Sequence, residues 1–329
     1  MINRTPSDRR GVGMVWTMCV VLAVLGMTVV PCQGAEYPSK PITLIVPFPP
    51  GGGADITGRL IANYLTKQWR QSVTVVNVPG GGSVSGTQQA LESAPDGYTL
   101  LLDVHVTGAM VPAVYENLPF DWKKRIPLGR LTVDASFYLV NPKSPYKTLS
   151  DLAKAVKASP QKFSWGGTGP GGLSTFVLGQ FFDTIGVNIT DTKMVALQGS
   201  APALTALAGG HIDIAAGLRS ESNPLLSAGK IRALAVVNQK RLEEWPDVPT
   251  VAEAGYPNLD VVAWQGVSAP VGLPKEVVDK WVIALRDATK DPEFLAQADN
   301  AKKTVAYLGP EEFKDLMLKE YKKYQELAK

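Results

Sequence analysis

Cysteine and histidine are scarce in this chain, which limits the chemistry it can perform. The 329 residues include two cysteines, Cys19 and Cys32, and two histidines. Both cysteines lie in an N-terminal segment that we expect to be removed on export, which would leave no disulfide, thiolate metal ligand or cysteine nucleophile. The histidines, His105 and His211, fall in different halves of the chain. Without cysteine to complete a ligand set, we expect no transition-metal site.

An excess of charge of one sign is also missing. Lys and Arg number 33 against 30 Asp and Glu, which gives a formal net charge of +3. Removal of the N-terminal segment takes away three arginines and one aspartate, which lowers the formal charge by two, to +1. Proteins that bind nucleic acid through its phosphates present a strongly basic face. We therefore expect no nucleic-acid partner.

Motifs for nucleotide cofactors and for covalent catalysis are absent or incomplete. No glycine run is followed by Gly-Lys-Ser or Gly-Lys-Thr, and the pattern Gly-x-Ser-x-Gly does not occur. Residues 167–172 formally match Gly-x-Gly-x-x-Gly, but Pro170 stiffens the motif and no acidic residue ends a strand at the required distance. We therefore expect no cofactor. An enzyme would also need a nucleophile paired with a base, which the sequence does not show, so we expect a protein that is not an enzyme.

Residues 1–35 have the pattern of a secretory signal peptide. Three arginines form a basic start, residues 11–30 are uncharged and largely apolar, and small residues near Gly34 would allow cleavage. The alternative is a retained membrane anchor, because the apolar run approaches the ~20 residues that span a bilayer. We expect export to the periplasm.

From Tyr37 onward, short apolar runs alternate with amphipathic stretches, the pattern of an α/β protein with largely parallel sheets. The run Ile42–Val46 predicts a buried strand, and Leu131–Val140 predicts another. Residues 250–253, with sequence Thr-Val-Ala-Glu, match a capping box and predict the start of a helix. The apolar stripe along residues 310–328 predicts a helix that packs on the core.

Three glycine-rich corners between a strand and a helix define the candidate site. They comprise residues 49–55, 166–172 and 198–200. Because a helix start presents unpaired N–H groups and the positive end of the helix dipole, each corner could hold an anion. Corners from two halves of the chain would form a cleft that grips a carboxylate from both sides. The alternative is that the glycines only permit tight packing.

Single residues near these corners have competing interpretations. His105 lies on a loop at the carboxyl edge of the predicted sheet, where α/β proteins bind ligands, although a structural histidine fits equally well. Asp55 is more often a helix cap than a base. Arg219 could grip a carboxylate with its guanidinium or lie on the surface, and we expect His211 to face the solvent. The predicted ligand-binding residues are Phe48, Gly52, Gly53, Ala54, Asp55, His105, Thr107, Gly167, Thr168, Gly169, Gly171, Ser174, Gln198, Ser200 and Arg219.

Several longer motifs are together more specific than any one glycine loop. They are residues 37–42 (Tyr-Pro-Ser-Lys-Pro-Ile), Val46–Asp55, Ala94–Leu100, Gly199–Leu204 and Pro246–Gly255. With these motifs in this order, the chain from about Tyr37 to its C-terminus resembles the Bug family, the periplasmic solute-binding proteins of tripartite tricarboxylate transporters. The resemblance implies a two-lobed, type II-like periplasmic binding protein fold that closes on a carboxylated metabolite in a cleft between the lobes. It also implies that the loops of residues 47–55 and 166–174 each hold one end of the ligand, partly through water.

On this basis we expect lobe I to comprise residues 36–138 and 255–329, and lobe II to comprise residues 139–254. The expected function is capture of a small carboxylated metabolite, either a di- or tricarboxylate or an aromatic carboxylate. A monomeric protein would then deliver it to the membrane permease subunits of a tripartite tricarboxylate transporter. The alternatives are a binding protein that feeds a sensor system and a secreted enzyme that uses the same cleft.

Three departures from the family pattern bear on the ligand. Gly167 and Thr168 stand where many members have two serines, and Thr175 stands in place of a histidine. Gly217 replaces a frequent aspartate, with Arg219 two residues later. Loss of an acidic group and gain of a basic one would disfavour amino-acid ligands, whose ammonium group needs a carboxylate, and would favour a second carboxylate on the ligand.

Overall fold

The structure is a computed structural model that describes residues 1–2, 37–197 and 199–328. Nearly all of the predicted signal peptide, and also Gln198, lie outside the described residues. Lys40–Lys329 form one compact unit. In the part of the chain that is described, no helix has the length and apolar character needed to cross a membrane.

The first sheet, within the described residues, has six strands in the order β11-β4-β10-β3-β1-β2. The strands are β1 (Ile42–Val46), β2 (Val73–Asn77), β3 (Thr99–Val104), β4 (Arg125–Asp134), β10 (Ala263–Pro270) and β11 (Thr304–Leu308). β1 runs parallel to β2 and β3, whereas β10 runs antiparallel to β3 and β4, and β11 antiparallel to β4. Leu44 and Val46 of β1 are fully buried, as expected for a strand that is covered on both faces.

The second sheet has five strands in the described part of the chain, in the order β7-β6-β8-β5-β9. The strands are β5 (Ser136–Val140), β6 (Ser164–Gly167), β7 (Lys193–Ala196), β8 (Ile214–Leu218) and β9 (Arg232–Val237). β6 runs parallel to β7 and β8, and β5 runs antiparallel to β8 and β9. Both sheets are therefore mixed, and the expectation of largely parallel sheets was wrong. The antiparallel pairs arise where the chain passes from one sheet to the other and returns.

The passage between the sheets also corrects a predicted strand. The apolar run Leu131–Val140 is not one strand, because β4 ends at Asp134 in the first sheet and β5 begins at Ser136 in the second. Both halves of the run are largely buried, including the polar residues Asp134 and Ser136 on either side of the crossing, so burial continues from one sheet into the other. The expected boundary between lobes, at residues 138 and 139, falls inside β5.

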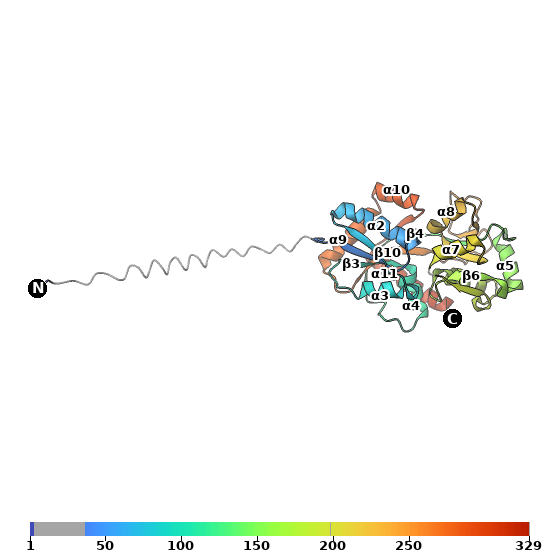
Figure 1. Cartoon of the computed structure of the whole chain (residues 1–329), viewed down its shortest axis with the longest axis horizontal. Helices are drawn as coiled ribbons and strands as arrows, with labels where there is room; N and C mark the ends of the chain where they lie inside the picture. Colours follow the sequence, from blue (N-terminus) through green and yellow to red (C-terminus); the bar gives the residue numbers. More distant parts are fainter. Residues whose placement is uncertain (3–36, 198, 329) are drawn as a thin grey trace. The chain divides into compact units, whose positions relative to one another are not determined.

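Helices pack against the faces of each sheet. Figure 1 shows α2, α9 and α10 beside strands of the first sheet, and α5, α7 and α8 beside the second. The helices are α2 (Gly53–Trp69), α3 (Val84–Leu91), α4 (Val111–Val114), α5 (Leu149–Ala158), α6 (Leu173–Thr184), α7 (Ser200–Gly209), α8 (Arg219–Ser227), α9 (Lys275–Ala288), α10 (Pro292–Asn300) and α11 (Pro310–Leu327). Shorter helical turns are η1 (Gly81–Ser83), η2 (Val106–Met110, of π type), η3 (Pro160–Lys162) and η4 (Ile189–Asp191).

Two local predictions have different outcomes. The stripe on α11 does pack on the core, since Phe313, Met317 and Tyr324 are buried, and full burial of such a side chain contributes about 1.5–3 kcal/mol. The expected helix after Thr250 is only a turn. Both capping-box bonds are present, from the Thr250 N–H to Glu253 Oε2 (2.8 Å) and from the Glu253 N–H to Thr250 Oγ1 (3.2 Å), but residues 250–255 form a turn and the chain then leaves it.

Candidate functional site

A cavity of about 680 Å³ lies where segments that follow strands of both sheets meet. Three helices begin at this cavity, because the first residues of α2, α6 and α7 line it: Gly53, Leu173 and Ser200. The residue that precedes each helix is a glycine, which has no side chain of its own to cap the helix start. The N-termini of three helices, with the positive ends of their dipoles, therefore meet at one space.

Most of the predicted binding residues lie at this cavity. Those that line it are Phe48, Gly52, Gly53, Ala54, His105, Gly167, Thr168, Ser174 and Ser200. Asp55, Thr107, Gly169, Gly171 and Arg219 do not line it, and Gln198 lies outside the described residues. His211, which was expected to face the solvent, is exposed and also lies at the cavity.

Asp55 holds the first corner in shape rather than facing the cavity. It is 4% exposed, and its Oδ2 accepts the Gly51 N–H and the Arg59 Nε–H, each at 3.0 Å. Its Oδ1 accepts an Asn77 Nδ2–H at 3.0 Å. Burial alone would raise the pKa of Asp55, but hydrogen bonds from Arg59, Gly51 and Asn77 outweigh it and hold the pKa below its ordinary value. The carboxylate thus bridges the glycine loop to α2 and β2.

Close packing explains why glycine begins α2. A Cβ atom on Gly53 would lie 2.8 Å from Leu218 Cδ1 and 3.1 Å from Lys303 Nζ. Only a residue without a side chain fits there without moving its neighbours, so its backbone N–H can be approached closely.

The residues of the second glycine-rich corner face in two directions, some toward the cavity and some toward α4. Gly167, Thr168 and Ser174 line the cavity. Gly169 and Gly171 face away from it: a Cβ on Gly171 would lie 2.9 Å from Val111 Cγ2, and one on Gly169 would lie 3.5 Å from the hydroxyl of Tyr115. These two glycines therefore allow the loop to pack against α4 and the residue that follows it.

His105 is a buried histidine at the cavity wall. The residue is 4% exposed, its Nδ1 lies 3.4 Å from the Trp264 carbonyl oxygen, and its Nε2 is buried without a hydrogen-bond partner. Burial lowers the pKa of His105 to about 4, so the imidazole is neutral at physiological pH. Because the ring is neutral and its Nε2 has no partner, this nitrogen can donate a hydrogen bond to a ligand or accept one from it.

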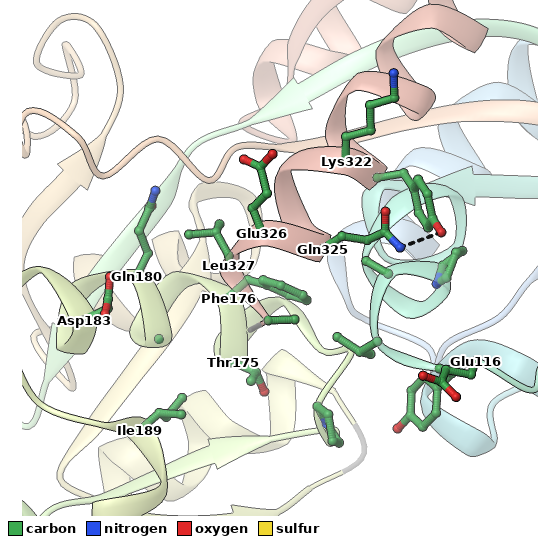
Figure 2. A pocket seen from close by; sticks show the side chains of 18 of the residues that line it. Glu116, Thr175, Phe176, Gln180, Asp183, Ile189, Lys322, Gln325, Glu326 and Leu327 are labelled. Atoms are coloured by element: carbon green, nitrogen blue, oxygen red, sulfur yellow. Dashed lines mark hydrogen bonds between the residues drawn. The ribbon is translucent and has the colours of Figure 1, made fainter.

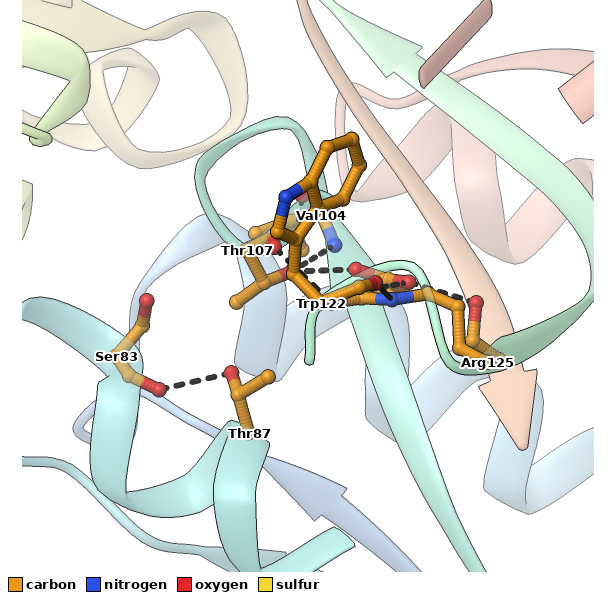
Figure 3. Close-up of polar contacts among 8 residues, drawn as sticks. Ser83, Thr87, Val104, Thr107, Trp122 and Arg125 are labelled. Carbon is orange, nitrogen blue, oxygen red and sulfur yellow. Dashed lines mark hydrogen bonds and ion pairs between the residues drawn. The ribbon is translucent and has the colours of Figure 1, made fainter. Parts of the chain in front are cut away.

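A buried ion pair supports the loop that carries His105. Asp103 Oδ2 accepts hydrogen bonds from Arg125 Nη1 and Ser268 Oγ, each at 2.6 Å, and Asp103 Oδ1 accepts one from Thr107 Oγ1 at 2.5 Å. Figure 3 shows Thr107, Val104 and Arg125 gathered in this network. Thr107 is thus a buried structural residue beside the cavity wall, consistent with its absence from the lining.

Arg219 points away from the cavity and Glu221 takes the place that had been considered for it. Arg219 Nε lies 2.5 Å from Glu244 Oε1. Glu221, which was not predicted, lines the cavity, and its Oε1 accepts the Gly53 N–H at 3.2 Å. Arg219 therefore does not supply the basic group that was expected near the ligand, and Glu221 supplies an acidic group there. An acidic residue in the first turn of a helix commonly complements the helix dipole, so no pattern in the sequence distinguishes Glu221 from an ordinary helix start.

A larger hollow, about 1320 Å³, lies among α4, α6 and α11. Figure 2 shows Thr175, Phe176 and Gln180 of α6 opposite Lys322 and Gln325 of α11. None of the predicted binding residues lines it. The three helix starts lie at the smaller cavity, which is therefore the candidate site. Within the described residues, no group of histidine, cysteine, aspartate and glutamate side chains could hold a metal ion.

The chain is similar to known proteins in sequence and in structure. The model of the tripartite tricarboxylate transporter family receptor matches residues 57–329. Protein BugT of Bordetella pertussis is 32% identical over 271 residues, which cover 79% of this chain and 82% of BugT. The structure of MatC (Rpa3494) from Rhodopseudomonas palustris with bound malate is 27% identical, with a TM-score of 0.82 over 89% of this chain and 100% of that one. The structure of R. palustris Rpa4515 with adipate is 26% identical, with a TM-score of 0.84 over 89% of this chain and 97% of that one.

These matches confirm the resemblance to the Bug family and the two-lobed α/β periplasmic binding protein fold. The family and its structural neighbours bind solutes and are not enzymes, which agrees with the lack of a nucleophile–base pair in the sequence. The chain therefore belongs to the tripartite tricarboxylate transporter receptor family of periplasmic solute-binding proteins.

Proposed function

We propose that the exported chain captures a small carboxylated molecule in the 680 Å³ cavity and delivers it to the permease subunits of a tripartite tricarboxylate transporter. The observation that carries the proposal is the convergence of the N-termini of α2, α6 and α7 on one cavity. Backbone N–H groups and helix dipoles at these ends favour an anion. A di- or tricarboxylate, or an aromatic carboxylate, combines an anionic group with a carbon skeleton that can pack against the apolar wall.

The size and chemistry of the cavity fit such a ligand. Its volume of about 680 Å³ lies within the range of about 300–1,000 Å³ that is typical of small-molecule sites. Much of its wall is apolar, including Phe48, Val106 and Leu173. A hydrogen bond to a charged acceptor contributes about 1.5–3 kcal/mol. Four or five such bonds, less the cost of ordering the ligand, correspond to roughly micromolar affinity.

The nearest experimental support comes from the structural neighbours, one of which holds malate and another adipate. Both molecules are dicarboxylates of a size that this cavity accommodates. We propose the same division of the chain as in the sequence analysis, with lobe I from residues 36–138 and 255–329 and lobe II from residues 139–254. In this proposal the protein acts as a monomer in the periplasm, and closure of the lobes on the ligand presents the loaded form to the permease.

A thermal-shift screen of the exported, processed protein tests the proposal. The panel contains malate, adipate, citrate, benzoate and aspartate, with the uncharged amides of the first four as matched controls. A ligand at 100 times its dissociation constant stabilises the folded state by about 2.7 kcal/mol. We expect at least one carboxylate to raise the melting temperature while its amide does not. Stabilisation by uncharged compounds alone would contradict the proposal.

A further inference from the structure

The charges around the cavity are uneven. Among the described residues that line it, Glu221 is the one carboxylic acid, and no lysine or arginine is present. The other titratable side chains there are His105, which is buried, and His211, which is exposed. An anion in this cavity therefore shares it with a carboxyl group and meets no basic side chain in the wall.

The carboxyl group of Glu221, in the first turn of α8, contacts the start of α2. Its Oε1 accepts the Gly53 N–H at 3.2 Å, and the hydroxyl of Ser200, at the start of α7, also hydrogen-bonds to this carboxyl group. Its Oε2 is shielded from solvent and has no hydrogen-bond partner. Glu221 thus occupies one of the helix-terminal amides that the proposed function assigns to the ligand.

The neighbouring charges do not neutralise Glu221. Lys303 Nζ is nearby, but it is bound at 2.7 Å to Asp134 Oδ2, and both of these side chains are fully buried. Ser220 Oγ donates to the same Asp134 oxygen at 2.6 Å. On the helix of Glu221 itself, Arg219 pairs with Glu244.

Burial raises the pKa of Glu221 to about 7, and the charge of Asp134 adds to this effect while Lys303 opposes it. His105 stays neutral at this pH because burial lowers its pKa to about 4. Glu221 can therefore gain or lose a proton near neutral pH without a change in the charge of His105.

We propose that Glu221 is a specificity-determining residue that makes the cavity bind its carboxylate ligand together with one proton. The inference rests on the proposed function, since it requires the ligand to be an anion. Two negative charges in one cavity without a basic side chain repel each other. When Glu221 takes up a proton, it becomes neutral and no longer repels the ligand. The Gly53 N–H can then donate its hydrogen bond to the charged ligand in place of the neutral Glu221.

The sign of the pH dependence follows from linkage. Above about pH 7 the free protein carries an ionised Glu221, and binding must take up a proton from solution. The apparent affinity for a carboxylate then falls by up to about tenfold for each pH unit above 7, and changes little below it. Replacement of Glu221 by glutamine removes the ionisable group and keeps an acceptor for the Gly53 N–H.

Isothermal titration calorimetry with malate, adipate, benzoate and aspartate between pH 6.5 and pH 8.5 tests the proposal. Measurement in two buffers with different heats of ionisation counts the protons taken up. For wild-type protein we expect about one proton taken up per carboxylate at pH 8.5, with affinity about tenfold or more below that at pH 6.5. In Glu221→Gln, proton uptake should disappear and the affinity at pH 8.5 should rise to the value seen at low pH.

Two control variants isolate the residue. Glu244→Gln removes a carboxylate that pairs with Arg219 and does not line the cavity, so its pH dependence should match the wild type. His211→Gln replaces the exposed histidine at the cavity, and a wild-type proton count in this variant assigns the proton to Glu221. The proton count of the wild-type protein tests the proposal even if a variant does not fold.

The outcomes separate this inference from the proposed function. Carboxylate binding with no proton uptake, or with the same pH dependence in Glu221→Gln, overturns the inference and leaves the function in place. Weaker binding in Glu221→Gln, with aspartate preferred over malate, also overturns it, because Glu221 would then accept a hydrogen bond from a ligand ammonium group. No binding of any carboxylate at any pH overturns the proposed function and the inference with it.

Discussion

Replacement of Asp103 by asparagine tests whether a buried ion pair holds the cavity wall. Asp103 is fully buried, and the side chain of Arg125, whose Nη1 lies 2.6 Å away, is 3% exposed. Asparagine keeps the shape of the side chain but removes its charge. Arg125 would then remain in the core with no carboxylate opposite its guanidinium.

The expected loss of stability follows from this burial. Removing one partner of a buried ion pair costs about 3–5 kcal/mol, because the other charge stays buried. The entropy of unfolding near 60 °C is about 2.1 cal/mol/K per residue, which gives about 0.6 kcal/mol/K for an exported chain of about 290 residues. The melting temperature of Asp103→Asn should therefore fall by about 5–8 °C.

Differential scanning calorimetry measures this shift. The matched control is Asp279→Asn, because Asp279 forms an ion pair with Lys275 at 2.5 Å but its side chain is 52% exposed. An exposed pair contributes about 0–1 kcal/mol, so the control should melt within about 2 °C of the parent. An Asp103→Asn protein that melts as the parent does would refute the assignment of this pair as a support for the wall.

Three further substitutions test local features. Thr148→Ala should lower the free energy of unfolding by about 1 kcal/mol in urea denaturation, because the Thr148 hydroxyl caps α5 at 3.0 Å, whereas Ser150→Ala in the same helix should change it little. Gly179→Ala should raise the free energy of unfolding by about 0.5–1 kcal/mol, because it lies inside α6 and the nearest atom to the new Cβ is 3.6 Å away. Gly53→Ala should weaken malate or adipate binding by about tenfold in calorimetric titration, because its Cβ would lie 2.8 Å from Leu218 Cδ1.

Opposite outcomes would be equally informative. A Thr148→Ala protein as stable as Ser150→Ala would show that the cap contributes nothing measurable. A less stable Gly179→Ala protein would indicate closer packing around α6 than the structure shows. Unchanged affinity in Gly53→Ala would remove the start of α2 from the binding site, and Gly179→Ala serves there as the control that should bind normally.

Local sequence predicted the strand-to-helix corners because their physics is local. Ile42–Val46 is short, apolar and rich in β-branched residues, and the glycines after it cannot continue a strand. The crossing at Ala135 could not be predicted in the same way, since both flanking strands are buried and the polar residues beside it, Asp134 and Ser136, are buried as well. The local sequence pattern also could not predict whether neighbouring strands run parallel or antiparallel. Their direction depends on how distant segments such as β10 return to the sheet.

The candidate site shows the same limit. The sequence located the strand end after which Arg219 and Glu221 stand, but not which of them faces the cavity. Residues two apart on a helix point to different sides, and the structure directs Glu221 to the cavity and Arg219 to Glu244. Asp55 and Thr107 were near the correct place in the chain, yet their hydrogen bonds with Arg59 and Asp103 turn them into supports.

The most direct test of the account compares a carboxylate with its uncharged amide at one pH. Calorimetric titration at pH 6.5 would use the tightest carboxylate of the panel and the amide of the same carbon skeleton. If helix-terminal N–H groups hold an anion, the amide should bind at least about 100-fold more weakly, because two charge-assisted hydrogen bonds become neutral ones. Equal affinity for the two compounds would contradict the claim that the cavity recognises negative charge.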